Sequence, residues 1–145
     1  MKLLILTQKV DKNDPILGFF HRWLIEFAKH AEYVTVICLE KGSHELPANV
    51  KVLSLGKEKK QFRLSYVWRF YEYIWNERKN YDVVFVHMNP EYIFLGGLLW
   101  RIWGKRIGLW YVHKNVDLKL RIASWLTNHI FTASPESFRL RSKKV

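Results

Sequence analysis

The sequence is poor in cysteine, has no glycine-rich motif and lacks long apolar runs. Cys38 is its only cysteine, which excludes an internal disulfide framework and indicates a reducing compartment. The longest apolar run, residues 92–100, falls well short of the about 18 residues needed to span a bilayer. Residues 3–6 are apolar but too few for a signal peptide. We therefore expect a cytoplasmic protein, or one that is peripheral at the inner membrane face.

Two kinds of cofactor site are missing as well. A dinucleotide-binding loop would carry Gly-x-Gly-x-x-Gly after the first strand, and only Gly18 is present there. Glu40 stands where a ribose-binding acid would stand, but without the glycines it does not indicate a nicotinamide or flavin enzyme. No Cys, His or carboxylate cluster has metal-ligand spacing, and no Asp-x-Asp is present. We expect neither a metal nor a cofactor.

The charge of the chain is strongly positive. The net charge of +11 implies attraction to nucleic acid, anionic lipid or phosphorylated substrates. The basic residues are scattered and form no nucleic-acid-binding module, which argues against nucleic acid as a partner. The best candidates for contact with an anionic membrane surface are residues 101–106 and 139–144.

Seven tryptophans are a second unusual feature of the composition. Tryptophan beside lysine or arginine is common at membrane interfaces. Trp23, Trp68 and Trp75, however, recur at the spacing of a helix face that packs on a core. We therefore predict that these three side chains pack in the interior.

The 145 residues, 49% hydrophobic and 26% charged, fit one globular domain over residues 1–145. Strand and helix patterns alternate, which predicts a doubly wound α/β fold with a mainly parallel sheet in the order 3-2-1-4-5-6. The predicted strands are residues 2–7, 34–39, 50–55, 83–86, 107–112 and 130–133, and the predicted helices are residues 19–31, 64–78, 90–103 and 118–126, with a basic helix after Ser134-Pro135. In this order the first and fourth strands are neighbours, so the loop at residues 8–18 and the turn at residues 87–90 face one crevice.

Two histidines close strands at that edge. His87 follows the buried run 83–86 and precedes Asn89-Pro90, which is a predicted helix start, with Asn89 as cap. His113 closes the fifth strand and Ser134 follows the sixth. The sequence leaves two interpretations open, since a histidine at a strand end is either a hydrogen-bonded structural residue or part of a site.

The order of these segments resembles the amino-terminal, acceptor-binding half of GT-B glycosyltransferases. More narrowly, it is similar to the retaining, sugar-nucleotide-dependent hexosyltransferases of family 4. The resemblance rests on Leu-Leu-Ile-Leu near the start, Gly18 opening a helix, and the strands that end at His87, His113 and Ser134. It implies a Rossmann-like domain that helps to move a hexose from a nucleotide sugar to a hydroxyl of a glycan or lipid-linked glycan.

The resemblance also implies residue roles. His113 matches the catalytic histidine near the transferred sugar, and Gly18 lies where the backbone approaches the donor diphosphate. His87, Asn89 and Ser134 would line the acceptor side of the cleft. The family often has Gly-Gly where this chain has Leu17-Gly18, which weakens the phosphate role of that loop.

One family feature is absent. These 145 residues contain no match to the family's donor-binding carboxyl-terminal domain with its Glu-x7-Glu, and the matching spacing of Glu32 and Glu40 lies in the wrong half. We therefore expect the chain to be inactive alone and to need a donor-binding half, missing or on a separate partner. The alternative is a non-catalytic α/β domain that recruits a partner or binds anionic membrane.

Overall fold

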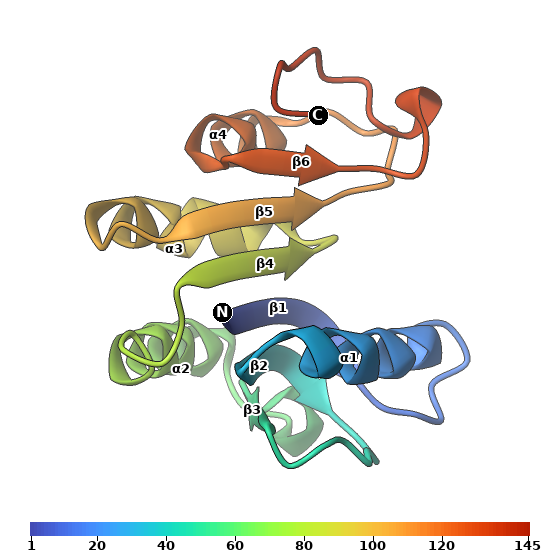
Figure 1. The fold of residues 1–145 in the computed structure, drawn as a ribbon, viewed down its shortest axis with the longest axis vertical. Coiled ribbons are helices and arrows are strands. Elements are labelled where there is room, and N and C mark those ends of the chain that lie inside the picture. The colour runs from blue at the N-terminus through green and yellow to red at the C-terminus, as the bar shows by residue number, and fades with distance from the viewer.

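The computed structural model describes residues 1–145 and contains one six-stranded parallel sheet in the order β3-β2-β1-β4-β5-β6. The strands are β1 (Lys2–Val10), β2 (Tyr33–Lys41), β3 (Val50–Ser54), β4 (Val83–His87), β5 (Arg106–Trp110) and β6 (His129–Phe131). The helices are α1 (Gly18–His30), α2 (Arg63–Asn76), α3 (Pro90–Ile102) and α4 (Leu118–Leu126), with short 3₁₀ turns η1 (Lys57–Lys59) and η2 (Pro135–Ser137). The predicted doubly wound, Rossmann-like fold and strand order are confirmed (Figure 1).

The helices cover the two faces of the sheet unequally. Alternate side chains of a strand point to opposite faces. On one face Leu3 and Ile5 of β1 pack with α1, and on the other Leu4 and Leu6 join the core under α2, α3 and α4. Figure 1 shows α1 lying over β1 and β2, with no helix over β4, β5 and β6 on the same side.

That uncovered half of the sheet is apolar. Phe85 of β4, Trp110 of β5 and Phe131 of β6 line a hollow of about 500 Å³ together with Trp23 and Phe27 of α1. A parallel sheet is ordinarily covered on both faces. The hollow is therefore a surface that a further element can occupy.

The glycine pair in α3 allows close packing against both neighbouring helices. A Cβ at Gly97 would lie 2.9 Å from Leu126 Cδ1 of α4, and a Cβ at Gly96 would lie 3.0 Å from Phe70 Cζ of α2. Each glycine costs about 1 kcal/mol relative to alanine in a helix. The close contacts that the two glycines allow with α2 and α4 account for their presence inside a helix.

Two expectations are wrong. No helix follows Ser134, because only η2 forms before the chain continues irregularly to its end. Trp68 and Trp75 are not in the core, since they are 74% and 54% exposed. The helix α2 has two apolar stripes, and the stripe containing Phe70 and Ile74 is the buried one. Periodicity identified a stripe but could not tell which one faces the sheet.

A buried hydrogen-bond chain joins α2, the segment before β4 and α3, and its loss has a predictable cost. Trp100 Nε1 donates to Tyr81 Oη at 3.0 Å, and Tyr81 Oη donates to the carbonyl of Ile74 at 3.1 Å. Tyr81→Phe leaves the indole N–H and the carbonyl unsatisfied inside the protein. We expect the free energy of unfolding to fall by about 1–3 kcal/mol in urea denaturation. Tyr33→Phe is the matched control, because Tyr33 is only half-buried and its hydroxyl makes no hydrogen bond within the chain; an equal loss in both variants would contradict the assignment.

Candidate functional site at the carboxyl edge of the sheet

The carboxyl ends of β1 and β4 lie side by side, as the sequence predicted. Leu3 pairs with Val83 and Leu6 with Val86 in parallel register. Beside them, His87 pairs with Trp110 of β5. All strands are parallel, so the segments after β1, β4, β5 and β6 leave the sheet at one edge. This edge includes the switch point where the winding reverses, which is where open α/β sheets bind ligands.

His87 lies inside the protein instead of facing solvent. Its side chain is 2% exposed and stacks on Phe20, with ring centroids 4.1 Å apart. Its Nδ1 is hydrogen-bonded to the hydroxyl of Thr7, at 3.1 Å. The rings of Phe19 and Trp23 approach it edge-on, with centroids 6.0 and 5.9 Å away. His87 therefore holds the first turns of α1 against β1 and β4.

Burial also fixes the charge of His87. Removal from water lowers the pKa of its imidazole from 6.5 to about 4, so the ring is neutral near pH 7. The expected crevice lined by two open imidazoles is not formed, because α1 covers this one. The structural interpretation that the sequence left open describes His87 better than direct contact with a ligand.

The turn after His87 has an unusual backbone. Met88 has a φ of 67°, in the left-handed region that bulky residues seldom adopt. Its amide donates to the carbonyl of Trp110 at 2.8 Å, which continues the pairing between β4 and β5. Such strain is concentrated at functional sites. Here it turns the chain sharply from β4 into α3.

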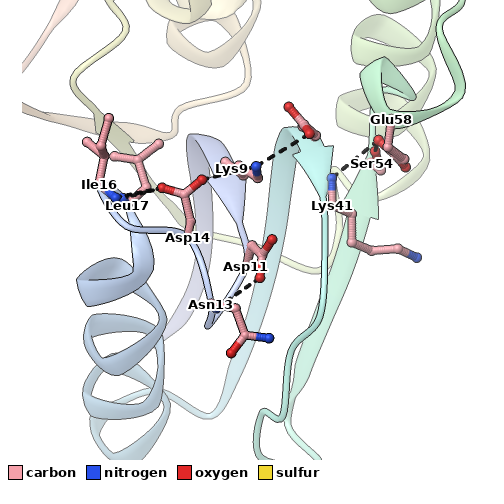
Figure 2. A network of polar contacts seen from close by, with 10 residues as sticks. Lys9, Asp11, Asn13, Asp14, Ile16, Leu17, Lys41, Ser54 and Glu58 are labelled. Carbon is pink, nitrogen blue, oxygen red and sulfur yellow. Dashed lines mark hydrogen bonds and ion pairs between the residues drawn. The ribbon is translucent and has the colours of Figure 1, made fainter.

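The carboxylate of Asp14 binds backbone amides at the start of α1. Asp14 Oδ1 accepts hydrogen bonds from the amides of Ile16 and Leu17, at 2.9 and 2.7 Å (Figure 2). The Gly18 amide donates to the Asp14 carbonyl at 3.0 Å. The Gly18 amide, expected near a donor diphosphate, is thus already bonded. Glycine is needed here for space, because a Cβ would lie 3.2 Å from the Lys12 carbonyl oxygen.

Lys9 completes this network, which sequence reasoning missed. Its Nζ lies 3.0 Å from Asp14 Oδ2 and 3.5 Å from Glu40 Oε1. Hydrogen bonds from the Leu17 amide and from Lys9 lower the pKa of Asp14 to about 2, so it stays ionised. Figure 2 shows the Asp14 carboxylate between the amides of Ile16 and Leu17 on one side and Lys9 on the other. Glu40, which stood at the position of a ribose-binding acid, is an ion-pair partner of Lys9.

A cavity of about 300 Å³ lies between α2 and α3, beside the carboxyl ends of β1 and β4. Asn89, a predicted site residue, lines it together with Gln8 of β1 and Glu91 of α3. Its remaining walls are apolar or aromatic: Leu39, Leu55, Tyr66, Val67, Phe70, Tyr92 and Leu95. A few polar groups on an apolar wall are typical of small-molecule sites, because the polar groups fix the orientation of a ligand.

The side-chain amides of Asn89 and Gln8 have hydrogen-bonding groups available for a ligand in this cavity. Asn89 stands at the N-cap of α3 but makes no capping hydrogen bond, which corrects the predicted role of its side chain. Its Nδ2 donates to the carbonyl of His87 at 3.3 Å, and its Oδ1 has no partner within the chain. The side-chain amide of Gln8 makes no hydrogen bond within the chain. The carboxylate of Glu91 has only a distant ion pair with Lys119, at 4.0 Å. Donors and acceptors for the polar groups of a ligand are therefore present.

The other two predicted residues, His113 and Ser134, follow β5 and β6. Both strands end earlier than predicted, so each residue lies three positions beyond the end of its strand. His113 is exposed, and its Nδ1 accepts a hydrogen bond from the Asn115 amide at 3.3 Å. In the neutral ring the proton is therefore on Nε2, which is free to donate to a ligand. Ser134 is half-buried and its hydroxyl is hydrogen-bonded to that of Ser137 at 2.9 Å. Since β5 and β6 are paired, both residues lie at the same edge of the sheet.

The predicted residues thus occupy different parts of one edge. Asn89 lines the cavity, His113 and Ser134 lie beyond β5 and β6, and Gly18 borders a separate polar hollow at the start of α1. Gln8 was missed, although its place directly after the first buried strand could have indicated it. Nothing in the sequence marked Glu91 as a lining residue. No group of three or more His, Cys, Asp or Glu side chains is placed to hold a metal ion.

Solved structures with this fold come from several proteins. They include Anabaena Alr3699/HepE in complex with UDP (18% identity, TM-score 0.60), UDP-GlcNAc 2-epimerase from Neisseria meningitidis bound to UDP-GlcNAc (14%, 0.59) and the lipopolysaccharide outer core galactosyltransferase WaaB in its apo form (9%, 0.57). The similarity covers 94% of this chain in each case, and 39%, 41% and 40% of the three other chains. At these identities it establishes the fold.

The chain spans about two fifths of the length of the solved chains it matches. No family model matches the chain, and no curated protein matches its sequence. None of its helices combines the length and the hydrophobicity that crossing a bilayer requires.

Proposed function

We propose that this chain is the acceptor-binding half of a glycosyltransferase that moves a hexose from a nucleotide sugar to an acceptor hydroxyl. The observation that carries the proposal is the cavity at the switch point between β1 and β4, with Asn89 and Gln8 in its wall. The fold supports it, because it recurs in chains solved with UDP or UDP-GlcNAc and in a galactosyltransferase. The family-4 relationship and transfer with retention belong to the same proposal.

The cavity is assigned to the acceptor. Its amides and the Glu91 carboxylate can exchange hydrogen bonds with sugar hydroxyls, and the aromatic wall can pack on the apolar face of a sugar ring. His113 is assigned to the transferred sugar, where Nε2–H can donate to a hydroxyl of the hexose. Ser134 borders the same side. His87 acts indirectly by positioning α1, since its ring is buried.

The donor is assigned to a second half, either continuous with this chain or on a partner. The uncovered face of β4, β5 and β6 supports this assignment. Parallel sheets are ordinarily covered on both faces, and a second half would supply an element that covers this one. The start of α1 also supports it, since its Gly18 amide and the amides bonded to Asp14 are not free to hold a diphosphate. The nucleotide sugar is a co-substrate in this proposal, and no metal is included.

The proposal is tested by completing the enzyme. The chain is joined to the part of Anabaena HepE that it does not cover, or expressed with its own donor-binding half. Transfer of labelled sugar from a panel of UDP-hexoses to glycan and lipid-linked acceptors is then measured. We expect product only when both halves and an acceptor are present. Folded, complete proteins that make no product with any donor and acceptor would contradict the proposal.

A further inference from the structure

The outward face of α2 is unusually apolar. Leu64, Trp68, Tyr71 and Trp75 recur at helical spacing and are 83%, 74%, 36% and 54% exposed. The other apolar stripe of α2, which includes Phe70, packs against the core. A surface helix ordinarily presents its polar side to water. The outward stripe of α2 is therefore unexplained by packing within this chain.

The neighbouring helix extends this surface. Phe94, Leu98 and Ile102 of α3 are 48%, 61% and 70% exposed and recur every four residues. The two helices are in contact, since Tyr71 Oη donates to the carbonyl of Leu95 at 2.8 Å. We name this surface the α2–α3 face, formed by Leu64, Trp68, Tyr71, Trp75, Phe94, Leu98 and Ile102.

Arginines border the α2–α3 face. Arg63 at the start of α2 and Arg101 at the end of α3 are exposed. The guanidinium carbon of Arg78 lies 4.0 Å from the ring centroid of Trp75, in a cation–π contact. Glu72 and Glu91 are the exposed carboxylates of these two helices. Exposed aromatic residues with arginines around them suit the boundary between water and lipid.

We propose that the α2–α3 face docks on a bilayer containing anionic lipid. The tryptophans and aliphatic side chains would enter the boundary between headgroups and acyl chains, and Arg63 and Arg101 would contact lipid phosphates. The net charge of +11 adds long-range attraction to such a surface. A second copy of this chain is a poorer occupant, because facing copies would bring strongly positive surfaces together.

The α2–α3 face adjoins the cavity, so docking would bring the cavity close to a membrane-bound acceptor. This inference rests on the proposed function. Val67 of α2 and Leu95 of α3 line the acceptor cavity and adjoin the α2–α3 face. A lipid-linked acceptor held in the bilayer could therefore reach the cavity without leaving the membrane completely. The acceptor class assigned to the cavity is accordingly a lipid-linked glycan.

Vesicle sedimentation tests the docking without any need for catalysis. The chain is mixed with vesicles of phosphatidylcholine alone and with vesicles that also contain phosphatidylglycerol. We expect binding only to the anionic vesicles, and its loss at about 1 M salt, where the Debye length is about 3 Å. Equal binding to both kinds of vesicle, or binding to neither, overturns the proposal.

Matched variants locate the surface. Trp68→Ala is expected to weaken partitioning about tenfold, and Arg101→Ala about fivefold. Arg22→Ala removes an exposed arginine from α1, on the opposite face of the sheet, and is expected to have little effect. Circular dichroism checks that each variant is folded. If Arg22→Ala weakens binding as much as Arg101→Ala, charge alone is responsible and the α2–α3 face is not the docking surface.

Light scattering without lipid separates docking from self-association. We expect a monomer mass at all concentrations for both the parent chain and Trp68→Ala. A dimer that Trp68→Ala abolishes would reassign the face to a protein interface and overturn the membrane proposal. Vesicle binding in a protein that transfers no sugar would contradict the proposed function alone, and transfer to lipid-linked acceptor without vesicle binding would contradict docking alone.

Discussion

Alanine in place of His113 is expected to lower turnover of the completed transferase about 100-fold, the typical loss when one preorganised donor is removed. The Asn115 amide occupies Nδ1, so Nε2–H is the group that remains to face the transferred sugar. The side chain is exposed and contributes little to the core, so the variant should fold normally. The measurement is kcat for sugar transfer, together with thermal unfolding of the variant.

His30→Ala is the matched control for His113. His30 is also exposed and ends α1, away from the carboxyl edge of the sheet. Its replacement is expected to leave kcat unchanged. His113→Gln keeps an N–H donor and should recover part of the activity. Unchanged turnover in His113→Ala, with the protein folded, would remove His113 from the mechanism.

Acid is expected to destabilise the domain through His87. Its pKa is lowered from 6.5 to about 4 by burial, so the unfolded chain binds the proton more readily than the folded one. The stabilisation from keeping the ring neutral is therefore complete above pH 6.5 and is lost as the pH falls to about 4. That difference in pKa corresponds to about 3 kcal/mol, a large share of the stability of an ordinary domain.

The His87 effect is isolated by a difference between variants. The free energy of unfolding is measured in urea between pH 7 and pH 4 for the parent chain and for His87→Gln, which cannot titrate and can still bond the Thr7 hydroxyl. Carboxylates such as Asp14 contribute to the slope of both proteins alike. His129→Gln, at an exposed position at the start of β6, should keep the parent slope. The same slope in the parent chain and His87→Gln would show that His87 is not held neutral by the fold.

The sheet was predictable because its determinants are local. Short apolar runs alternating with amphipathic segments specify parallel strands, and right-handed crossovers then leave few orders of strands. The pairing of Leu3 with Val83 and of Leu6 with Val86 follows from that order.

The outward stripe of α2 was not predictable from periodicity. Phe70 and Ile74 form one apolar stripe, and Trp68 and Trp75 form another, at the same helical spacing. Which stripe faces the sheet depends on the partner surface that α3 offers, including the space that Gly96 leaves for Phe70. Tertiary packing therefore determines the orientation of α2. It places Trp68 and Trp75 on the surface, although the sequence predicted both in the core.

The positions of the candidate site residues in the fold were predictable, but their environments were not. The edge of the sheet and its residues Asn89 and His113 follow from strand order, whereas the burial of His87 depends on how α1 closes over it. The bond between Asp14 and the start of α1 depends on a loop conformation that no short motif encodes. Sequence reasoning therefore located the edge and could not say which side chains remain open to a ligand.

Chemical shifts of the backbone amides, measured on the isolated domain during titration, test the central claim most directly. We predict that glycan or lipid-linked acceptors perturb the amides of Gln8, Asn89 and the segment after β5, and that UDP without acceptor leaves them unchanged. Perturbation by acceptors only at the amino edge, around Arg106 and His129, would contradict the acceptor assignment. Saturable binding of UDP at the start of α1 would contradict the division into acceptor and donor halves.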